Sequence, residues 1–312
     1  ADDQPPADQP HLLPIEASLA ETAAGCLFFQ VAHYYRKCPR LFTHLCFTVG
    51  EKRCRRLILW YSGTGNSRFA AEQIAVGTGE RAVSMNDLIR EGGKPELSSA
   101  LPFVFVFPTY AWRPPECVVE LIKRIKFRGS SHAYFIMTAS GDVGDSEKYL
   151  RELCETKALL FMGLGAVRMP QNYAARFELA TVEEDRQTVQ AAVPVLREIS
   201  KTILAGQPLD TDPEMAKETF KSHHLNGYFK NHMNSDRPFR VTDRCTGCGQ
   251  CSEQCVMHDI VMQDGRPVWQ GHCNHCMSCY GNCPTEAIEF GSKTEKRPKY
   301  SFFKLDFGPS LR

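Results

Sequence analysis

The chain has 312 residues, more than the about 250 to 300 that one hydrophobic core usually serves, so we expect two domains. Lysine and arginine total 37 against 36 aspartate and glutamate residues, a balance that gives no reason to expect nucleic acid or an anionic membrane as a partner. No stretch approaches the roughly 20 consecutive apolar residues of a membrane helix, so we expect no membrane span.

The N-terminal segment, residues 1–55, begins with a run rich in proline, aspartate and glutamine. Such a composition lacks the apolar content to fold alone, and we expect a poorly ordered extension. Cys38, Cys46 and Cys54 recur every eight residues with His44 among them, but their spacing matches no zinc site.

From residue 57 onward, apolar runs that predict buried strands alternate with amphipathic segments that predict helices. The predicted strands cover residues 57–61, 101–107, 133–137 and 159–169. The predicted helices cover residues 67–77, 116–126, 146–156 and 183–205. Fully apolar strands that alternate with amphipathic helices indicate an α/β fold, a doubly wound parallel sheet with helices on both faces.

A polar loop joins the first predicted strand to the first predicted helix. It consists of Ser62, Gly63, Thr64, Gly65, Asn66 and Ser67. Hydroxyls, backbone N–H groups and the positive end of a helix can enclose a phosphate at such a place. The loop lacks the endings typical of nucleotide and dinucleotide loops, and a mononucleotide phosphate fits better. It resembles the phosphate loop of flavodoxins, which implies FMN; a plain strand-to-helix turn is the alternative.

Two further loops follow the next predicted strands, where doubly wound sheets bind their ligands. The residues that we expect to contact the flavin there are Thr109, Tyr110, Ala111, Trp112, Ser140, Gly141 and Gly144. Tyr110 and Trp112 can stack on an isoalloxazine ring, although a packed aromatic pair is the alternative. Residues 140–146 contain no aromatic side chain, so we expect one ring face to be open or covered by the second domain.

The second half of the chain contains an internal repeat with an offset of 28 residues. Its first copy carries Cys245, Cys248, Cys251 and Cys255, and its second carries Cys273, Cys276, Cys279 and Cys283. Each copy has the spacing C-x2-C-x2-C-x3-C, which is typical of thiolates that hold iron–sulfur clusters. Zinc ribbons need only two CxxC pairs, and disulfides do not require such regular duplication.

This spacing resembles bacterial-type ferredoxins with two [4Fe-4S] clusters, in which the fourth ligand of each cluster comes from the other repeat. The resemblance implies one cluster on Cys245, Cys248, Cys251 and Cys283, and the other on Cys273, Cys276, Cys279 and Cys255. Val256 follows Cys255 where such ferredoxins usually have proline, as in Cys283-Pro284. Proline shapes the turn and binds no iron, so we expect ligation to survive this difference.

Taken together, residues 56–300 resemble a family of flavodoxin and dicluster ferredoxin fusion proteins of anaerobic bacteria and archaea. Further similarities lie at residues 169–173, 239–243, 265–269 and 296–300. The resemblance implies a flavodoxin-like domain over 56–206, a linker over 207–238, a small α+β ferredoxin domain over 239–291 and a tail over 292–312. The sequence of the linker has no strong hydrophobic periodicity.

The implied function is electron transfer between FMN, two [4Fe-4S] clusters and redox protein partners. A flavin-dependent oxidoreductase acting on a small molecule such as a quinone or nicotinamide is the second hypothesis, but we find no nicotinamide fingerprint. A third is that the flavodoxin-like half binds no flavin and serves as a docking module; the intact loop at 62–67 argues against it. The sequence predicts no oligomeric state.

The remaining cysteines and histidines predict little further chemistry. Cys117 and Cys154 fall on predicted helices and are expected to be buried structural thiols. His258, His272 and His275 flank cluster ligands and are expected at the surface or as tuners of the potential. The clustering of cysteines predicts metal in a reducing cytoplasm. The chain opens without a basic secretory signal, and its first methionine is Met85, so we expect the initiator to lie outside this sequence.

Overall fold

The computed structural model describes residues 56–216, 221–229 and 234–307. The predicted N-terminal extension, with Cys38, His44, Cys46 and Cys54, lies outside the described residues. Residues Cys54–Asp306 form one compact unit, which contains all the elements below.

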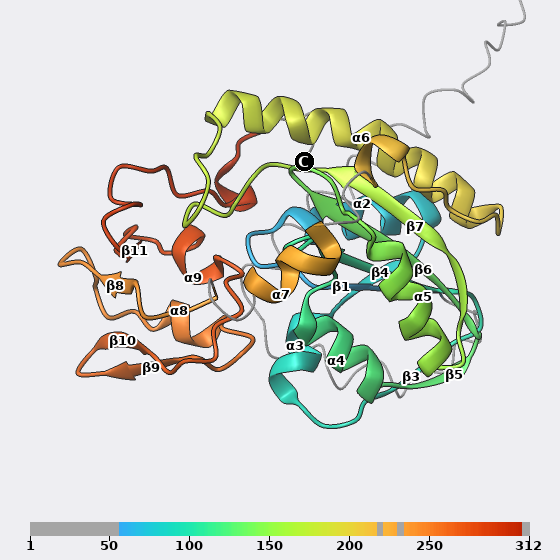
Figure 1. Cartoon of the computed structure of the whole chain (residues 1–312), viewed down its shortest axis with the longest axis horizontal. Helices are drawn as coiled ribbons and strands as arrows, with labels where there is room; N and C mark the ends of the chain where they lie inside the picture. The colour runs from blue at the N-terminus through green and yellow to red at the C-terminus, as the bar shows by residue number, and fades with distance from the viewer. Residues whose placement is uncertain (1–55, 217–220, 230–233, 308–312) are drawn as a thin grey trace, which may run out of the picture. The chain divides into compact units, whose positions relative to one another are not determined.

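A five-stranded parallel sheet with the order β2-β1-β4-β6-β7 is the centre of this unit (Figure 1). Its strands are β1 (Leu57–Trp60), β2 (Arg81–Ser84), β4 (Phe103–Pro108), β6 (His132–Ala139) and β7 (Leu160–Arg168). Numbered among themselves, these strands have the order 2-1-3-4-5, which defines a flavodoxin-like doubly wound fold. The α/β fold that the sequence predicts is therefore confirmed for this half.

Helices cover both faces of the sheet, as Figure 1 shows. They are α2 (Asn66–Thr78), α3 (Met85–Glu91), α4 (Glu116–Arg124), α5 (Ser146–Thr156) and α6 (Val182–Leu204). Helices α2 and α6 contact each other on one face, and α3, α4 and α5 lie on the other. The approach of α2 to α6 requires Gly77, because a Cβ atom there would lie 2.6 Å from Ser200 Oγ.

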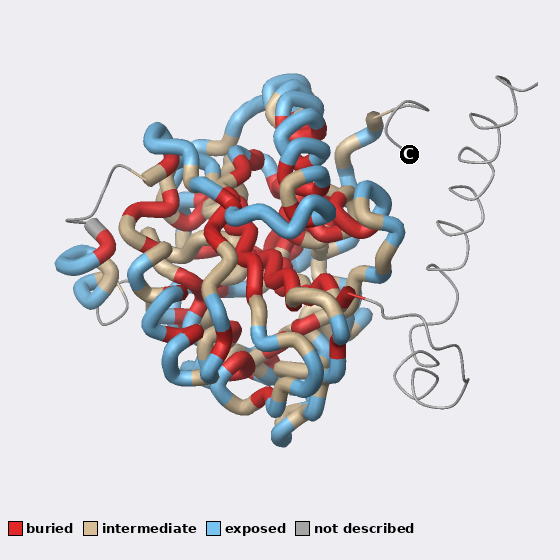
Figure 2. Tube along the Cα trace, turned by 90° about the vertical axis from the view of Figure 1, so that its right-hand side faces the viewer, coloured by how far each residue is buried: buried red, intermediate tan, exposed pale blue. Residues whose placement is uncertain are grey.

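The core lies between β4, β6 and the helices, in the buried centre of the tube in Figure 2. Alternate aromatic side chains of neighbouring strands stack there: the ring centroids of Phe105 and Phe135 are 5.3 Å apart, and those of Phe135 and Phe161 are 5.8 Å apart. All five residues from Phe103 to Phe107 are fully buried. A strand buried on both faces reads as a continuous apolar run, which is why the sequence predicts it.

A second, two-stranded parallel sheet was not predicted. It pairs β3 (Glu96–Ser99) with β5 (Lys126–Gly129). The predicted helix 116–126 is consequently too long: α4 ends at Arg124, and Lys126 opens β5. Most side chains of both strands are exposed or half-buried, so neither produces an apolar run. The same reason explains why β2 and α3 were not predicted.

The C-terminal part repeats one structural unit twice. Helices α8 (Gln250–Glu253) and α9 (Ser278–Gly281) contact each other and are related by the 28-residue offset of the cysteines. Each is followed by a strand, β9 (Ile260–Gln263) or β11 (Ile288–Phe290). Strand β9 pairs antiparallel with β10 (Arg266–Trp269), and β11 with β8 (Phe239–Val241).

The segments predicted as linker and tail contain short helical turns. These are η2 (Pro213–Met215), the π-helix η3 (Lys221–Leu225), α7 (Asn226–Tyr228) and η5 (Phe302–Lys304). Leu209 and Met215 of the first segment are buried against the flavodoxin-like half, where Leu209 forms a parallel bridge with Gly163. Within the ranges that the structure describes, no helix is both long and apolar enough to cross a membrane.

The first turn of α6 contains a buried acid that makes stability depend on pH. Asp185 is 4% exposed, and burial, with a contribution from Glu184, raises its pKa to about 6. An acid whose pKa is higher in the folded than in the unfolded chain stabilises the fold at low pH, and this contribution is lost as the pH rises from about 4 to 6.

Asp185→Asn is therefore expected to match the wild type near pH 4 and to be more stable by about 1 kcal/mol at pH 7, since an amide avoids the buried charge. Denaturant midpoints measured across this pH range check the prediction. Asp210→Asn, at an exposed position, is the control and should leave the pH profile unchanged. Equal midpoints for Asp185→Asn and wild type at pH 7 would contradict the account.

Candidate functional site

Four cysteines from both repeats line one cavity in the C-terminal part. They are Cys245, Cys248 and Cys251 of the first repeat and Cys283 of the second. Apolar residues, among them Met262, Pro267 and Ile288, form the rest of its wall. The structure thus places Cys283 beside the first repeat, although its own run of cysteines lies elsewhere.

The other four cysteines lie close together in a more buried place. Burial, first, and the nearby Cys276, Cys273, Cys255 and Cys251 raise the pKa of the Cys279 thiol well above its ordinary value. Burial also raises the pKa of the Cys276 thiol to about 12, and Cys255 adds to this effect. Cys255 of the first repeat is thus near Cys273, Cys276 and Cys279 of the second, and Cys251 is also near Cys279.

Backbone N–H groups point at three of these sulfurs. Asp259 N lies 3.4 Å from Cys255 Sγ, His275 N lies 3.3 Å from Cys273 Sγ, and Ala287 N lies 3.3 Å from Cys283 Sγ. The first and third contacts are related by the 28-residue repeat. N–H donors of this kind stabilise negative charge on sulfur and tune the potential of a cluster.

Within the described residues, these thiols take part in neither a disulfide nor a group placed to hold one metal ion. The described cysteines form no disulfides. Among the described residues, no three histidine, cysteine, aspartate or glutamate side chains are placed to hold a single metal ion.

The loop at residues 62–67 lies where the sequence places it, between β1 and α2, with Gly65 in the left-handed region at φ 105°. Its polar side chains are bonded within the chain. Ser62 Oγ accepts from Gly65 N at 3.1 Å, Ser67 Oγ lies 2.7 Å from Thr138 Oγ1, Asn172 Nδ2 donates to Thr64 Oγ1 at 2.9 Å, and Asn66 Nδ2 donates to Pro170 O at 2.9 Å. The exposed fractions of Thr64 and Ser67 are 1% each.

Residues of the C-terminal part cover this loop. A Cβ atom on Gly63 would lie 2.2 Å from the carbonyl oxygen of Cys276, and Asn282 Nδ2 donates to Gly63 O at 3.3 Å. Phe302 N donates to Thr64 O at 2.9 Å. The loop has the polar groups of a phosphate site, and residues of the C-terminal part occupy the space beside Gly63 and Gly65.

The second predicted flavin loop forms a tight turn. Tyr110 and Arg113 exchange two backbone hydrogen bonds, of 2.9 and 3.2 Å. Between them, Ala111 and Trp112 both have positive φ, 46° and 62°. This is the conformation of a type I′ turn, which normally takes asparagine and glycine. The left-handed region costs other residues about 1 to 2 kcal/mol each, so the turn is strained.

The neighbouring segments hold this turn in place. Asn226 Nδ2 donates to Ala111 O at 2.9 Å, and Ser222 Oγ donates to Trp112 O at 3.0 Å. Thr109 precedes the turn and donates its N–H to Thr138 O at 2.8 Å. The turn therefore holds Trp112, which is half-buried, at the carboxyl end of β4.

Ala111→Asn is expected to stabilise the protein by about 1 kcal/mol, because asparagine tolerates the left-handed region better than alanine. The denaturant midpoint of the anaerobic protein is the readout. Ala205→Asn serves as the control, since Ala205 has an ordinary φ of −73°. A midpoint no higher than that of the control would mean that the turn stores no strain.

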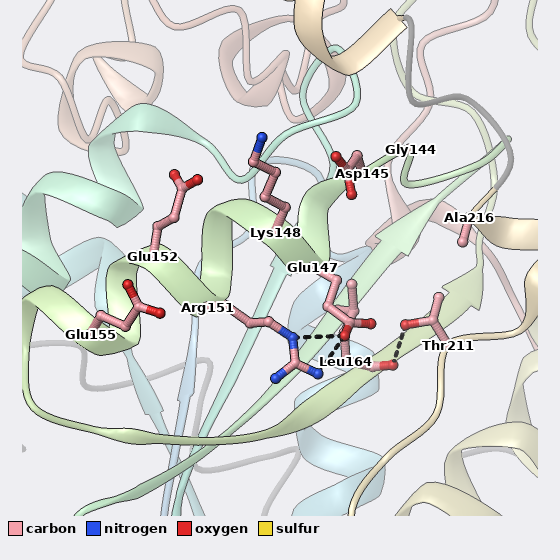
Figure 3. Close-up of a pocket in the computed structure, with 10 residues that line it drawn as sticks. All are labelled: Gly144, Asp145, Glu147, Lys148, Arg151, Glu152, Glu155, Leu164, Thr211 and Ala216. Carbon is pink, nitrogen blue, oxygen red and sulfur yellow. Dashed lines mark hydrogen bonds and ion pairs between the residues drawn. The ribbon is translucent and has the colours of Figure 1, made fainter.

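The third predicted loop is open on its outer side. Ser140 and Gly141 are exposed, and Ser140 Oγ accepts from Gln171 Nε2 at 2.9 Å. Gly144 is buried and instead borders a hollow of about 470 Å³ beside α5 (Figure 3). That hollow is lined mostly by charged side chains, and an ion pair of Arg151 with Glu147 occupies part of it. It brings together none of the other predicted flavin residues.

The structure also locates His275 and the two helical cysteines that the sequence analysis named. His275 was expected at the surface or as a tuner of the potential, but the surface alternative is wrong: it is 5% exposed, Tyr173 OH lies 2.9 Å from its Nδ1, and burial lowers its pKa to about 4. Cys154 is buried in α5 as predicted. Cys117 is half-buried and accepts a hydrogen bond from Asn274 Nδ2 at 3.5 Å.

Asn274 also links the second cysteine run to the sheet. Its Nδ2 donates to Tyr61 OH at 2.8 Å, and its Oδ1 accepts from Cys276 N at 3.2 Å. Tyr61 OH in turn lies 3.4 Å from Tyr110 OH. Burial raises the pKa of both tyrosines well above the ordinary value, so both stay neutral. No local sequence signal marks Asn274, because its partners lie far away in the chain.

No protein-family model matches the chain, and no curated protein matches it. Among solved structures, it is similar to a flavodoxin from the domain Archaea, with 13% identity over 48% of this chain and 98% of that chain and a TM-score of 0.26. The Trp repressor binding protein of Bacillus subtilis has 13% identity over 46% of this chain and 97% of that chain, with a TM-score of 0.27. The Flv1 flavodiiron core of Synechocystis sp. PCC6803 has 16% identity over 50% and 38%, with a TM-score of 0.28. At these scores the strand order, rather than the likeness, defines the fold class.

Proposed function

We propose that this chain is an electron-transfer protein that holds two [4Fe-4S] clusters in a C-terminal ferredoxin domain. One cluster is assigned to Cys245, Cys248, Cys251 and Cys283, and the other to Cys273, Cys276, Cys279 and Cys255. The observation that carries the proposal is the cavity lined by three cysteines of the first repeat and the last cysteine of the second. Sequence spacing and spatial grouping support the same ligand sets.

When bound, each cluster supplies a site for one electron. The chain's own residues present the thiolates, donate N–H groups to three sulfurs and exclude water with apolar walls. The two sets differ in access, because Cys248 is exposed whereas Cys279 is 8% exposed. Electrons therefore exchange with a redox protein partner beside Cys248, whereas Cys276 of the second set lies against Gly63 of the flavodoxin-like half.

A relay that includes FMN is the second candidate function. The strained turn that holds Trp112 at the carboxyl end of β4 favours it, since strain of this kind gathers at functional sites. The covered loop at 62–67 weighs against it, and equally against a flavin-dependent oxidoreductase acting on a quinone or nicotinamide. The proposal includes a flavodoxin-like domain over 56–206, a linker over 207–238, a ferredoxin domain over 239–291 and a tail over 292–312.

Reductive titration of the anaerobically purified protein tests this function. We expect the visible absorbance of the protein to bleach reversibly with the uptake of about two electrons per chain, one for each cluster. Uptake of about four electrons, with the spectrum of a reduced flavin, would favour the relay with FMN. A protein without visible absorbance after reconstitution with iron and sulfide would contradict the proposal.

A further inference from the structure

We infer that residues 62–67 form a joint that seats the second cysteine run on the flavodoxin-like half, in place of a site for a flavin phosphate. We call the contacts of residues 62–67 with residues 274–282 and 300–303 the joint. The inference goes beyond the proposed electron transfer and does not depend on which partner receives the electrons. It assigns to the flavodoxin-like half the role of a docking module.

The close approach at Gly63 is the first argument. The Cys276 carbonyl occupies the position that a side chain at residue 63 would need, at 2.2 Å from an ideal Cβ. The φ of Gly63 lies outside the left-handed region, so its backbone conformation does not demand glycine. The contact with Cys276 explains the glycine at this position.

The amide of Asn282 strengthens this side of the joint. Its Nδ2 lies 3.3 Å from Gly63 O and 3.2 Å from Gln254 Oε1, so one side chain ties the loop to both cysteine repeats. Its Oδ1 accepts from Ser301 Oγ at 2.6 Å, which adds the C-terminal segment. Asn282 immediately precedes Cys283, the cysteine that crosses between the repeats.

The segment at residues 300–303 closes the other side. Tyr300 OH donates to Asn66 Oδ1, and the ring of Phe302 stacks on Phe69 with centroids 4.7 Å apart. A side chain at residue 65 would meet Phe302, because an ideal Cβ atom built on Gly65 lies 2.7 Å from Phe302 Cβ. Both the amide oxygen and the amide nitrogen of Asn66 are thus used within the chain.

In the joint, groups of the loop that could bind a phosphate are in contact with other residues of this chain. A buried dianion is stable only where several donors are free to bond it. Asn66 Nδ2 already donates to Pro170 O, and Ser67 Oγ is paired with Thr138 Oγ1, whereas Ser62 Oγ and Thr64 Oγ1 accept in their bonds. A phosphate that took these groups would compete with the bonds of Asn66 and Ser67, and it would have to share the loop with the Cys276 carbonyl beside Gly63.

Gly63→Ala tests the joint directly, because the added methyl group meets backbone rather than a flexible side chain. We expect hydrogen exchange of the peptide over 62–67 in the anaerobic, cluster-loaded protein to accelerate by about tenfold or more, together with faster proteolysis within 207–238. Gly141→Ala is the matched control, since a Cβ there meets nothing within 4 Å and its φ also lies outside the left-handed region. Exchange in Gly63→Ala equal to that in the control would overturn the inference.

Asn282→Ala provides a milder variant should Gly63→Ala fail to fold. It removes the bonds to Gly63 and Ser301 and adds no clash, so we expect a smaller acceleration of exchange at the same peptide. Exchange identical to the wild type in this variant would contradict the inference as well.

Binding of FMN by the wild-type protein separates the joint from a phosphate site. Calorimetry with FMN and with riboflavin, on protein whose iron content is measured in the same sample, should detect stoichiometric binding of neither. One FMN per chain, bound more tightly than riboflavin, would identify a phosphate site and overturn the inference. Because iron is counted separately, failure of the joint and failure of the cluster proposal are distinguishable.

Discussion

Replacing Cys283 with serine is expected to remove the cluster of the first repeat, although Cys283 belongs to the second. The reason is that Cys283 lines the same cavity as Cys245, Cys248 and Cys251. The iron content should fall from about eight to about four per chain, because one [4Fe-4S] cluster loses a ligand. Iron analysis and electron paramagnetic resonance of the reduced protein are the measurements.

Two matched variants decide which cluster is lost. If the ligand sets cross between the repeats, the spectrum of Cys283→Ser should match that of Cys245→Ser, and the spectrum of Cys255→Ser should match that of Cys273→Ser. Cys154→Ser is the control, since this buried thiol lies in α5, away from both sets. A match of Cys283→Ser with Cys273→Ser would show instead that each repeat holds its own cluster.

Replacing Lys299 with methionine is expected to lower the free energy of unfolding by about 3 kcal/mol, because it leaves a buried carboxylate without its nearest cation. Lys299 Nζ lies 2.5 Å from Glu289 Oε2, and both side chains are buried. Lys299 Nζ also lies 3.9 Å from the centroid of the Tyr280 ring, next to Cys279. Arg244, at 3.2 Å from Glu289 Oε1, offsets part of the loss.

Denaturant unfolding of the same cluster-loaded preparation gives the readout. Lys296→Met is the control, because Lys296 is exposed on the same segment. The double variant Lys299→Met with Glu289→Leu should recover part of the lost stability, since it removes the unpaired charge. If the double variant loses as much stability as the two single variants lose together, or more, an unpaired buried charge is not the cause.

Local patterns predicted the frame of the fold well. The helix expected at 146–156 is α5 (Ser146–Thr156), and the strand expected at 133–137 lies within β6, because amphipathic and fully apolar runs carry their own periodicity. The polar strands β3 and β5 could not be predicted, since they depend on each other for pairing rather than on burial. The small sheet of β3 and β5 could therefore not be predicted from the sequence.

The candidate site also has one part that a local sequence pattern predicts and one part that depends on contacts between distant residues. The grouping of the cysteines is implied by the resemblance to dicluster ferredoxins, which rests on a spacing repeated every 28 residues. The covering of residues 62–67 depends on contacts such as Asn282 with Gly63 and Tyr300 with Asn66, which are separated by 219 and 234 residues. A loop that binds a phosphate and a loop that receives a carbonyl both need glycine. The sequence could not distinguish these two uses.

The central claim concerns two [4Fe-4S] clusters on interlocking cysteine sets, and elemental analysis of the anaerobically purified protein tests it most directly. Iron, acid-labile sulfide and zinc should be counted on one sample together with the protein concentration. The account predicts about eight irons and about eight sulfides per chain, with no stoichiometric zinc. Zinc at one or two ions per chain without sulfide, persisting after reconstitution with iron and sulfide, would contradict it.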